Sequence, residues 1–283
     1  EIAGVEAVLT HRDIKGSNRL GLFEKDQPIL ADQVVRHYGD AVALVVAKDK
    51  EVLTLALDAI QVCYEPLPAV FDPEEACREE APVLYEGRPD KNILLRSEIT
   101  SGQGRAALAD CVYRTEISIE LGWQEHAFLE TQTGVAWQEM DGSLVMVVST
   151  QTPFRDRLEI GEALGIAPGN IRISAPHLGG GFGGKDGITV QGFLALAALH
   201  TGGRPVKINY SREESILAGT KRHPAKLTYV LGCDGEGKLQ ALDCRIVMDT
   251  GAYASLGGPV FALAMEHAGG PYRIPHASIS GAV

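Results

Sequence analysis

The segment His177–Gly187, with the sequence HLGGGFGGKDG, is the feature that most constrains the fold of this chain. Five of the seven residues from Gly179 to Lys185 are glycine, and the other two are Phe182 and Lys185 itself. Glycine loses more conformational entropy on folding than any other residue, so this cluster indicates a loop that turns tightly or approaches a ligand closely. The whole chain has 32 glycines, where average usage of about 7% predicts roughly 20.

Length and charge limit the possible partners. The 283 residues, 45% of them hydrophobic, suffice for one large or two ordinary globular domains. The 26 Lys and Arg against 37 Asp and Glu give a net charge of -11, and no basic stripe offsets it. Nucleic acid and acidic membrane surfaces are therefore not expected as partners. Because no signal segment opens the chain and the apolar runs are too short to span a bilayer, a non-membrane, cytoplasmic protein is expected.

The cysteines argue against a covalent or metal framework. They are odd in number, far apart and never in a C-x-x-C pair, which disfavours disulfides, a zinc site and an iron–sulfur cluster within this chain. A reducing compartment is the simpler expectation. The five are Cys63, Cys77, Cys111, Cys233 and Cys244.

The first 80 or so residues read as a small α+β unit. Apolar runs and period-2 alternation predict strands, and apolar residues at helical spacing predict a helix. A polar stretch punctuated by Pro and Gly follows, so we place a domain boundary near residue 80. The predicted strands are 4–10, 40–49 and a third that alternates from Ile60 to Tyr64 until Pro66 and Pro68 end it, and the predicted helix is 50–60.

The second part continues the α+β pattern. A helix is predicted to begin near Thr152, with Pro153 at its first position and Gly165 closing it. After the glycine loop, an apolar stretch predicts a buried helix that Gly202 caps. The predicted strands are 111–121, 133–140, 143–152, 170–178, 204–214 and 277–283, and residues 226–253 are predicted to form a hairpin that turns at CDGEG.

The glycine loop has several interpretations. Gly179-x-Gly181-x-x-Gly184 fits the dinucleotide-binding fingerprint between a predicted strand and helix, and Ser211 and Arg212 further on would suit a ribose 2′-phosphate. However, that fingerprint normally opens a domain of repeating βαβ units, whereas antiparallel strands are predicted around this loop.

A phosphate-binding P-loop is a second interpretation, since Gly179 and Gly184-Lys185 fit G-x-x-x-x-G-K. Asp186 stands where that motif needs Ser or Thr to hold magnesium, and its carboxylate would repel a triphosphate. A hinge or a plain turn is a third. Phe182 favours a fourth, in which backbone N–H groups and one rigid ring approach a large cofactor together.

Five ordered segments extend the argument beyond the loop. They are GWQEHAFLETQ, TQTPF, GGGFGGK, KRHPAKLTYVLGCDGEG and MEHAGGPYRIPH. Together they resemble the molybdopterin-binding large subunit of the xanthine dehydrogenase and aldehyde oxidase family, over essentially the whole chain. The resemblance implies an α/β hammerhead domain over residues 1–80 and the first part of a mixed α+β molybdenum-cofactor-binding domain over residues 81–283.

The resemblance also implies a molybdenum-dependent oxidoreductase. Such enzymes hydroxylate an aldehyde or N-heterocycle with oxygen from water, at molybdenum held by molybdopterin, in some members as the cytosine dinucleotide. Electrons leave through [2Fe-2S] clusters, usually towards FAD. An iron–sulfur subunit and a FAD subunit are therefore expected as partners in a hetero-oligomer.

Cofactor-binding residues follow from the matching segments. Gln124 matches a glutamine that hydrogen-bonds near the metal, a role for a fixed amide donor. Gly181, Phe182 and Gly183 match residues whose backbone approaches the molybdenum centre. No side chain of the chain is expected to ligate the metal.

Two residues are implied to contact substrate, and both depart from the family pattern. Asp186 stands where purine-oxidising members have a glutamate, and His267 where they have an arginine. The shorter carboxylate and the loss of the guanidinium fork argue against purine recognition by this pair. Alternatively, Asp186 caps the following helix and His267 is a buried, hydrogen-bonded imidazole. Glu266 is expected to have a buried partner, and His126 and His223 are expected to be structural.

The catalytic glutamate of the family, in a later G-x-G-E-like segment, has no match here, and neither has the later arginine-containing FRG segment. Both ends of the sequence also read as interrupted elements. We therefore expect a piece of a longer subunit that is inactive alone. Two other functions stay open, namely an NADP-binding oxidoreductase domain that uses Gly179, Gly181 and Gly184, and a non-catalytic carrier of the pterin cofactor.

Overall fold

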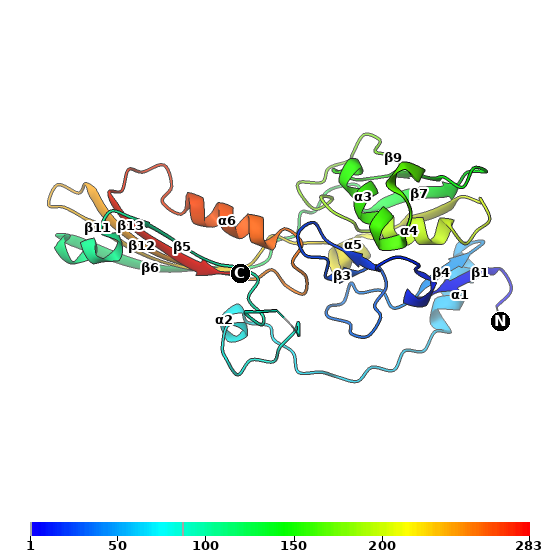
Figure 1. The fold of residues 1–283 in the computed structure, drawn as a ribbon, viewed down its shortest axis with the longest axis horizontal. Coiled ribbons are helices and arrows are strands. Elements are labelled where there is room, and N and C mark those ends of the chain that lie inside the picture. The colour runs from blue at the N-terminus through cyan, green and yellow to red at the C-terminus, as the bar shows by residue number, and fades with distance from the viewer. Residues whose placement is uncertain (1, 87) are drawn as a thin grey trace. The chain divides into compact units, whose positions relative to one another are not determined.

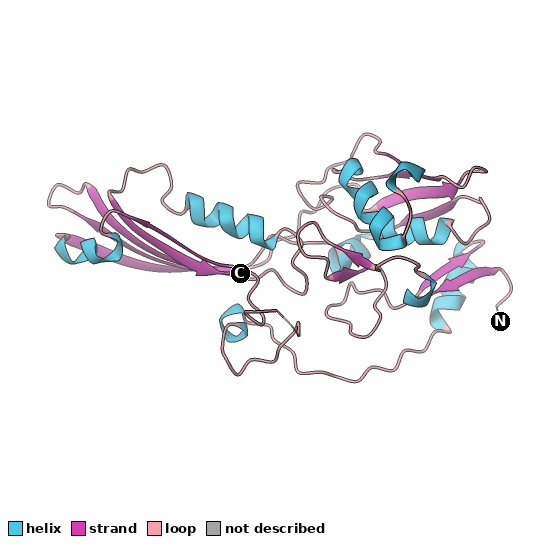
Figure 2. Cartoon of the chain, in the orientation of Figure 1, coloured by secondary structure: helices cyan, strands magenta, loops and turns pink. Residues whose placement is uncertain are grey.

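The computed structural model describes residues 2–86 and 88–283. They form two compact units, each assembled from two separate stretches of chain. Unit 1 comprises Glu1–Glu65 and Glu125–Lys221, and unit 2 comprises Pro66–Gln124 and Arg222–Val283. Both units combine helices with strands that are mostly antiparallel (Figure 2), as the sequence predicts. The domain boundary near residue 80 stays a prediction.

Unit 1 is built on a four-stranded sheet in the order β10-β7-β8-β9, in which only the β8–β9 pair is parallel. Helix α4 contacts β7, β8 and β10, and α3 contacts β9 (Figure 1). The strands are β7 (Thr133–Gln138), β8 (Leu144–Val148), β9 (Ile171–Ser174) and β10 (Val206–Asn209), and the helices are α3 (Pro153–Leu164), α4 (Gln191–Ala198) and α5 (Arg212–Ala218).

The ends of α3 and α4 can be compared with the helix ends predicted from the sequence. Helix α3 begins at Pro153 and ends at Leu164, and Gly165, whose φ is 73°, caps it as predicted. Helix α4 is buried on nearly all sides, also as predicted, but it ends at Ala198 and its C-cap is Leu199, so the assignment of Gly202 as the cap is wrong. Gly202 lies in the turn that follows, with φ 61°.

The N-terminal segment adds two small sheets and a helix to unit 1. Strand β1 (Val5–Leu9) pairs with β4 (Leu44–Ala47), and β2 (Arg19–Leu20) pairs with β3 (Gln27–Pro28). Helix α1 (Lys50–Asp58) begins where the Asp49 side chain accepts a hydrogen bond from the Val52 N–H at 2.9 Å. The strand predicted to begin at Ile60 and to end before Pro66 is wrong, because these residues form no regular element.

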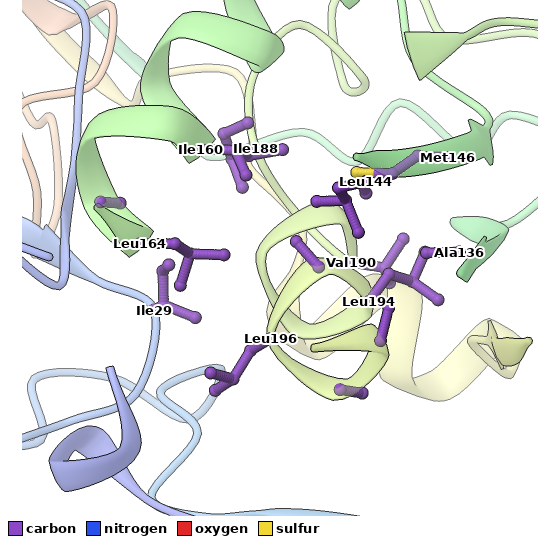
Figure 3. Close-up of a cluster of buried hydrophobic side chains, with 14 of the residues drawn as sticks. Ile29, Ala136, Leu144, Met146, Ile160, Leu164, Ile188, Val190, Leu194 and Leu196 are labelled. Atoms are coloured by element: carbon purple, nitrogen blue, oxygen red, sulfur yellow. The ribbon is translucent and has the colours of Figure 1, made fainter. Parts of the chain in front are cut away.

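The core of unit 1 is shared between the N-terminal segment and the sheet. Leu9, Leu20 and Ile29 are buried together with residues of β8, α3 and α4. Figure 3 shows part of this cluster, with Ile29 near Leu164 of α3 and Leu196 of α4. A Cβ at Gly192 would lie 3.2 Å from Ile29, so the glycine allows this close approach. The backbone N–H of Asn18 also donates to the carbonyl of residue 163 at 3.0 Å.

Unit 2 is a five-stranded sheet in the order β5-β13-β12-β11-β6, and helix α6 packs against it (Figure 1). The predicted hairpin is confirmed as β11 and β12, and Phe261 and Met265 of α6 are fully buried on the sheet. Neither β5 nor α6 was predicted from the sequence. The elements are β5 (Arg96–Ser101), β6 (Tyr113–Leu121), β11 (Ala225–Cys233), β12 (Leu239–Met248), β13 (His276–Ala282), α2 (Pro73–Ala76) and α6 (Gly257–His267).

The described residues also include short 3₁₀ helices at His11–Asp13, Gly104–Asp110 and Pro168–Asn170. Within the described ranges, no helix combines the length and the hydrophobicity needed to cross a membrane.

Candidate functional site

The glycine loop connects β9 to α4 in unit 1 and has an unusual backbone. Gly180 and Gly183 have φ of 95° and 94°, and Phe182 between them has φ of 52°. A non-glycine residue with positive φ is uncommon and strained. The Phe182 side chain is 76% exposed, so packing of the ring against unit 1 does not account for this conformation. The loop therefore presents an aromatic ring outward at a cost in backbone strain.

One glutamine side chain accepts two hydrogen bonds from this loop. Gln151 Oε1 accepts from the backbone N–H of Gly183 at 3.0 Å and from that of Lys185 at 3.2 Å. Two further loop N–H groups bond inside the loop, Gly184 to the carbonyl of Gly181 at 2.7 Å and Asp186 to the carbonyl of Gly183 at 3.1 Å. The second half of the loop is thus held from within unit 1.

The buried side chain of Lys185 anchors the loop to unit 1. Its side chain is 1% exposed, and its Nζ lies 2.9 Å from Glu130 Oε2 and 4.7 Å from the centre of the Phe128 ring. The Gly179 N–H donates to the same carboxylate oxygen at 3.0 Å. Burial acts to raise the pKa of Glu130, but the hydrogen bonds from Lys185 and Gly179 and the lysine charge outweigh it and hold this pKa below its usual value.

Asp186 is committed to an ion pair. Its Oδ1 lies 2.6 Å from Arg155 Nη2, and Arg155 Nε lies 3.3 Å from Glu159 Oε1. Burial raises the pKa of Glu159. The alternative that Asp186 caps the next helix is wrong, because the N-cap of α4 is Val190, four residues further on.

A buried carboxylate ties the end of β8 to the start of α4. Asp156 is fully buried, and it accepts hydrogen bonds from the hydroxyls of Thr150 and Thr152 at 2.5 and 3.0 Å and from the Gln191 amide at 3.0 Å. Burial outweighs these hydrogen bonds and raises the pKa of Asp156. Gln151 lies between the two threonines, so this network also holds the residue that supports the loop.

His126 packs directly against the loop. A Cβ at Gly184 would lie 2.8 Å from His126 Nδ1, so only glycine fits beside this ring. The Nδ1 atom is buried and has no partner within the described part of the chain. The imidazole therefore forms part of the support of the loop.

Gln124 and His267 belong to unit 2. Gln124 is exposed and forms an isolated β-bridge with Arg222, whose N–H donates to its carbonyl at 3.0 Å. His267 is the last residue of α6, is exposed, and has Nδ1 2.9 Å from the carbonyl of Leu263. The alternative of a buried imidazole is therefore wrong. Glu266 is exposed as well, so its expected burial is wrong too.

The contacts argue against the two phosphate-binding interpretations. The lysine that a P-loop would extend to a phosphate, Lys185, is buried on Glu130. Arg212, the candidate for a 2′-phosphate, donates to the carbonyls of residues 128 and 129 at 2.6 and 2.9 Å. Helix α4 begins only at Gln191, whereas the glycines of a dinucleotide fingerprint themselves open the helix.

The residues that support the loop were not singled out from the sequence. Gln151 and Glu130 lay inside quoted motifs, TQTPF and FLETQ, but nothing in the local pattern said what they would contact. Asp156 and Arg155 follow Pro153 on the first turn of α3, where an acidic residue is expected for helix electrostatics alone. Among the described residues, no three His, Cys, Asp or Glu side chains come together as a metal site.

Comparison with known proteins gives two family matches. Residues 84–283 match the family model described as molybdopterin cofactor-binding domain, and residues 1–68 match the one described as aldehyde oxidase and xanthine dehydrogenase, a/b hammerhead domain.

Two curated relatives illustrate the similarity in sequence. The chain is 44% identical to a probable xanthine dehydrogenase subunit of Bacillus subtilis (strain 168), covering 99% of this chain and 37% of the relative. It is 40% identical to the nicotinate dehydrogenase large molybdopterin subunit of Eubacterium barkeri, covering 98% of this chain and 64% of the relative. The chain thus spans less than two thirds of either relative.

Solved structures are similar over nearly the whole chain. The aldehyde oxidoreductase from Desulfovibrio gigas superposes with a TM-score of 0.93 at 27% identity, over 99% of this chain and 32% of that one. A Cu,Mo-CO dehydrogenase superposes with a TM-score of 0.87 at 29% identity, over 99% of this chain and 38% of that one.

Proposed function

Because this chain belongs to the aldehyde oxidase and xanthine dehydrogenase family and contains its molybdopterin cofactor-binding domain, we propose that the glycine loop of unit 1 binds a molybdenum–molybdopterin cofactor. The observation that carries the proposal is the outward-facing Phe182, held in a strained conformation between glycines. A strained residue of this kind persists where function requires it.

The loop also has donors to offer a ligand. The backbone N–H groups of Gly180, Gly181 and Phe182 find no acceptor within the described part of the chain. Backbone N–H groups that have no acceptor of their own suit an electron-rich, oxygen-bearing group. The residues present therefore fit a pterin cofactor of the family's type.

The reaction we propose is hydroxylation of an aldehyde or an N-heterocycle. When bound, the cofactor supplies oxygen derived from water and takes up two electrons. We propose that these electrons pass to [2Fe-2S] clusters and FAD on an iron–sulfur subunit and a FAD subunit, and that the cofactor is in the cytosine dinucleotide form. Two relatives whose names describe them as subunits support a hetero-oligomer, which we place in the cytoplasm.

Each predicted residue has a proposed role. Gly181, Phe182 and Gly183 let the backbone approach the cofactor, and Gln124 offers it a side-chain amide. Asp186, held by Arg155, contacts the substrate, as does His267. We assign no general base among these 283 residues, because the family resemblance puts that glutamate in a different segment, and we propose that this piece is inactive alone.

The test is metal and pterin analysis of the protein that contains this chain, purified from its host. We expect stoichiometric molybdenum and released fluorescent pterin, and aldehyde- or N-heterocycle-dependent reduction of a dye. Saturable binding of NADPH without molybdenum would favour the NADP-binding alternative. Molybdenum and pterin without any substrate-dependent reduction would favour the carrier.

A further inference from the structure

We infer that Gln151 is a positioning residue that pre-forms the glycine loop for its ligand, an inference that rests on the proposed function. The loop's own glycines cannot fix a single conformation, because glycine populates many. An external group must select one of them. Gln151 Oε1 does so by accepting from Gly183 N–H and Lys185 N–H at once.

Two backbone N–H groups that converge on one point form a concave donor site, which in many proteins takes up an anion. In this chain the neutral amide oxygen of Gln151 already fills that position. The N–H groups of residues 183 and 185 are therefore withdrawn from any ligand. The N–H groups of residues 180–182 remain without an acceptor among the described residues. Gln151 therefore determines which part of the loop faces the cofactor.

The contact is reciprocal and sterically fitted. The backbone N–H of Gln151 donates to the carbonyl of Lys185 at 3.0 Å, so three hydrogen bonds join the two segments. A Cβ at Gly181 would lie 2.3 Å from Gln151 Oε1 and 2.9 Å from its Cδ. A residue with a Cβ at position 181 would therefore displace the Gln151 amide from its place beside the loop.

The backbone on both sides of Gln151 is anchored. Its neighbours Thr150 and Thr152 both donate to the buried Asp156, and the Thr152 N–H donates to the Thr150 hydroxyl at 3.0 Å. A side chain on such a rigid base can impose its geometry on a loop, whereas one on a mobile segment cannot. The support thus runs from the interior of unit 1 to the loop.

The experiment compares two substitutions in the protein that contains this chain. Gln151→Leu keeps the approximate size but removes the acceptor, whereas Gln151→Glu keeps an acceptor oxygen at the same reach. Residue-resolved amide hydrogen exchange reports on the loop, and molybdenum and pterin content report on the ligand. Gln138→Leu is the matched control, because the Gln138 amide makes one hydrogen bond, to Gly142 in an exposed hairpin.

For Gln151→Leu we expect exchange at residues 183 and 185 to quicken by about tenfold or more, as befits lost hydrogen bonds. Molybdenum and pterin content should fall severalfold, and Gln151→Glu should restore both readouts towards wild type. Wild-type exchange in Gln151→Leu would overturn the inference, as would equal loss of cofactor in Gln138→Leu.

Two outcomes separate this inference from the proposed function. If the wild-type protein carries no molybdenum but Gln151→Leu still frees residues 183 and 185, the support is real and the cofactor assignment fails. If Gln151→Leu does not fold, Gln151→Met is used in its place. Failure of Gln151→Glu to restore loop protection would reduce Gln151 to ordinary packing.

Discussion

At the scale of single residues, the buried charge of Lys185 can stabilise the loop only because Glu130 supplies the opposite charge. Lys185 is 1% exposed, while Glu130 keeps 30% of its side-chain surface. Removing the Glu130 carboxylate leaves the buried Lys185 ammonium without a counter-charge. Glu130→Ala should therefore lower the free energy of unfolding by about 3–5 kcal/mol. Lys185→Met removes the buried charge and leaves a carboxylate that water can reach, so it should cost less, about 1–2 kcal/mol. Urea unfolding at neutral pH measures both; a larger cost for Lys185→Met would contradict this account.

The same pair predicts a pH dependence. The pKa of Glu130 lies below its usual value of 4.5 in the folded protein, so its contribution is present above pH 4.5 and is lost as pH falls through the lowered folded pKa. The difference in unfolding free energy between wild type and Glu130→Gln should therefore shrink on acidification through that window. A difference that grows instead would show that the carboxylate is not stabilised in its ionised form.

Phe182 should matter for the ligand and not for stability. A left-handed conformation costs a non-glycine residue about 1–2 kcal/mol, and glycine costs about 0.5–1 kcal/mol of backbone entropy. Phe182→Gly should thus leave the unfolding free energy within about 1 kcal/mol of wild type, while molybdenum and pterin content falls severalfold. Phe128→Ala is the contrasting variant, because Phe128 is 1% exposed and should lose about 3–5 kcal/mol.

At the scale of elements, Asp156 joins β8, α3 and α4 and should give stability an unusual dependence on pH. Its folded pKa lies above the usual 3.8 because burial disfavours the charge. The folded state then binds the proton more tightly, so the contribution of Asp156 falls as pH rises from 3.8 through the raised folded pKa. Asp156→Asn cannot ionise, so the stability of wild type relative to this variant should decline over that window.

Asp156→Ala serves as the control for that comparison. It leaves Thr150, Thr152 and Gln191 without their acceptor, which should cost at least about 2 kcal/mol at every pH. Urea unfolding is measured at a series of pH values upward from the usual carboxyl range, where most other carboxyls are already ionised. If the difference in unfolding free energy between wild type and Asp156→Asn did not change with pH, the pKa of Asp156 would not differ between the folded and unfolded states.

Sequence patterns predicted elements well where local signals were strong. Pro153 and Gly165 mark both ends of α3, and the D-G pair turns the β11–β12 hairpin. The strand predicted at 204–214 is too long, because Ser211 and Glu214 form a capping box that starts α5. That box is readable from sequence, but the strand pattern masked it. Helix α6 was not predicted, because a short apolar run does not by itself identify a helix.

The site was predicted only in part, for a physical reason. The resemblance named the glycine loop, and the structure places Gly181, Phe182, Gly183 and Asp186 together in it. The supports come from elsewhere, since Glu130 and Gln151 lie 55 and 34 positions from Lys185 in sequence. Such contacts depend on tertiary packing, which spacing along one chain does not encode.

At the scale of the whole molecule, the chain passes between the units three times, so neither unit is a continuous segment. Family membership and the α+β class with its hammerhead part are confirmed. The core of unit 1 nevertheless draws on both the N-terminal segment and residues beyond 124. Residues 1–80, which the sequence predicts as a domain, therefore do not have a core of their own.

We expect residues 1–80, produced alone, not to fold cooperatively. Leu9, Leu20, Ile29 and Leu30 are at most 5% exposed in the chain, and the cluster that buries them includes α3 and α4. Without those helices the piece would expose its apolar core, and a domain of this size has little stability to spare. A piece spanning residues 1–221 contains all of unit 1 and should show a cooperative thermal transition and a near-ultraviolet circular dichroism signal that residues 1–80 lack. A cooperative transition in residues 1–80 alone would mean that its small sheets and α1 suffice, and would support an independent domain that ends near residue 80.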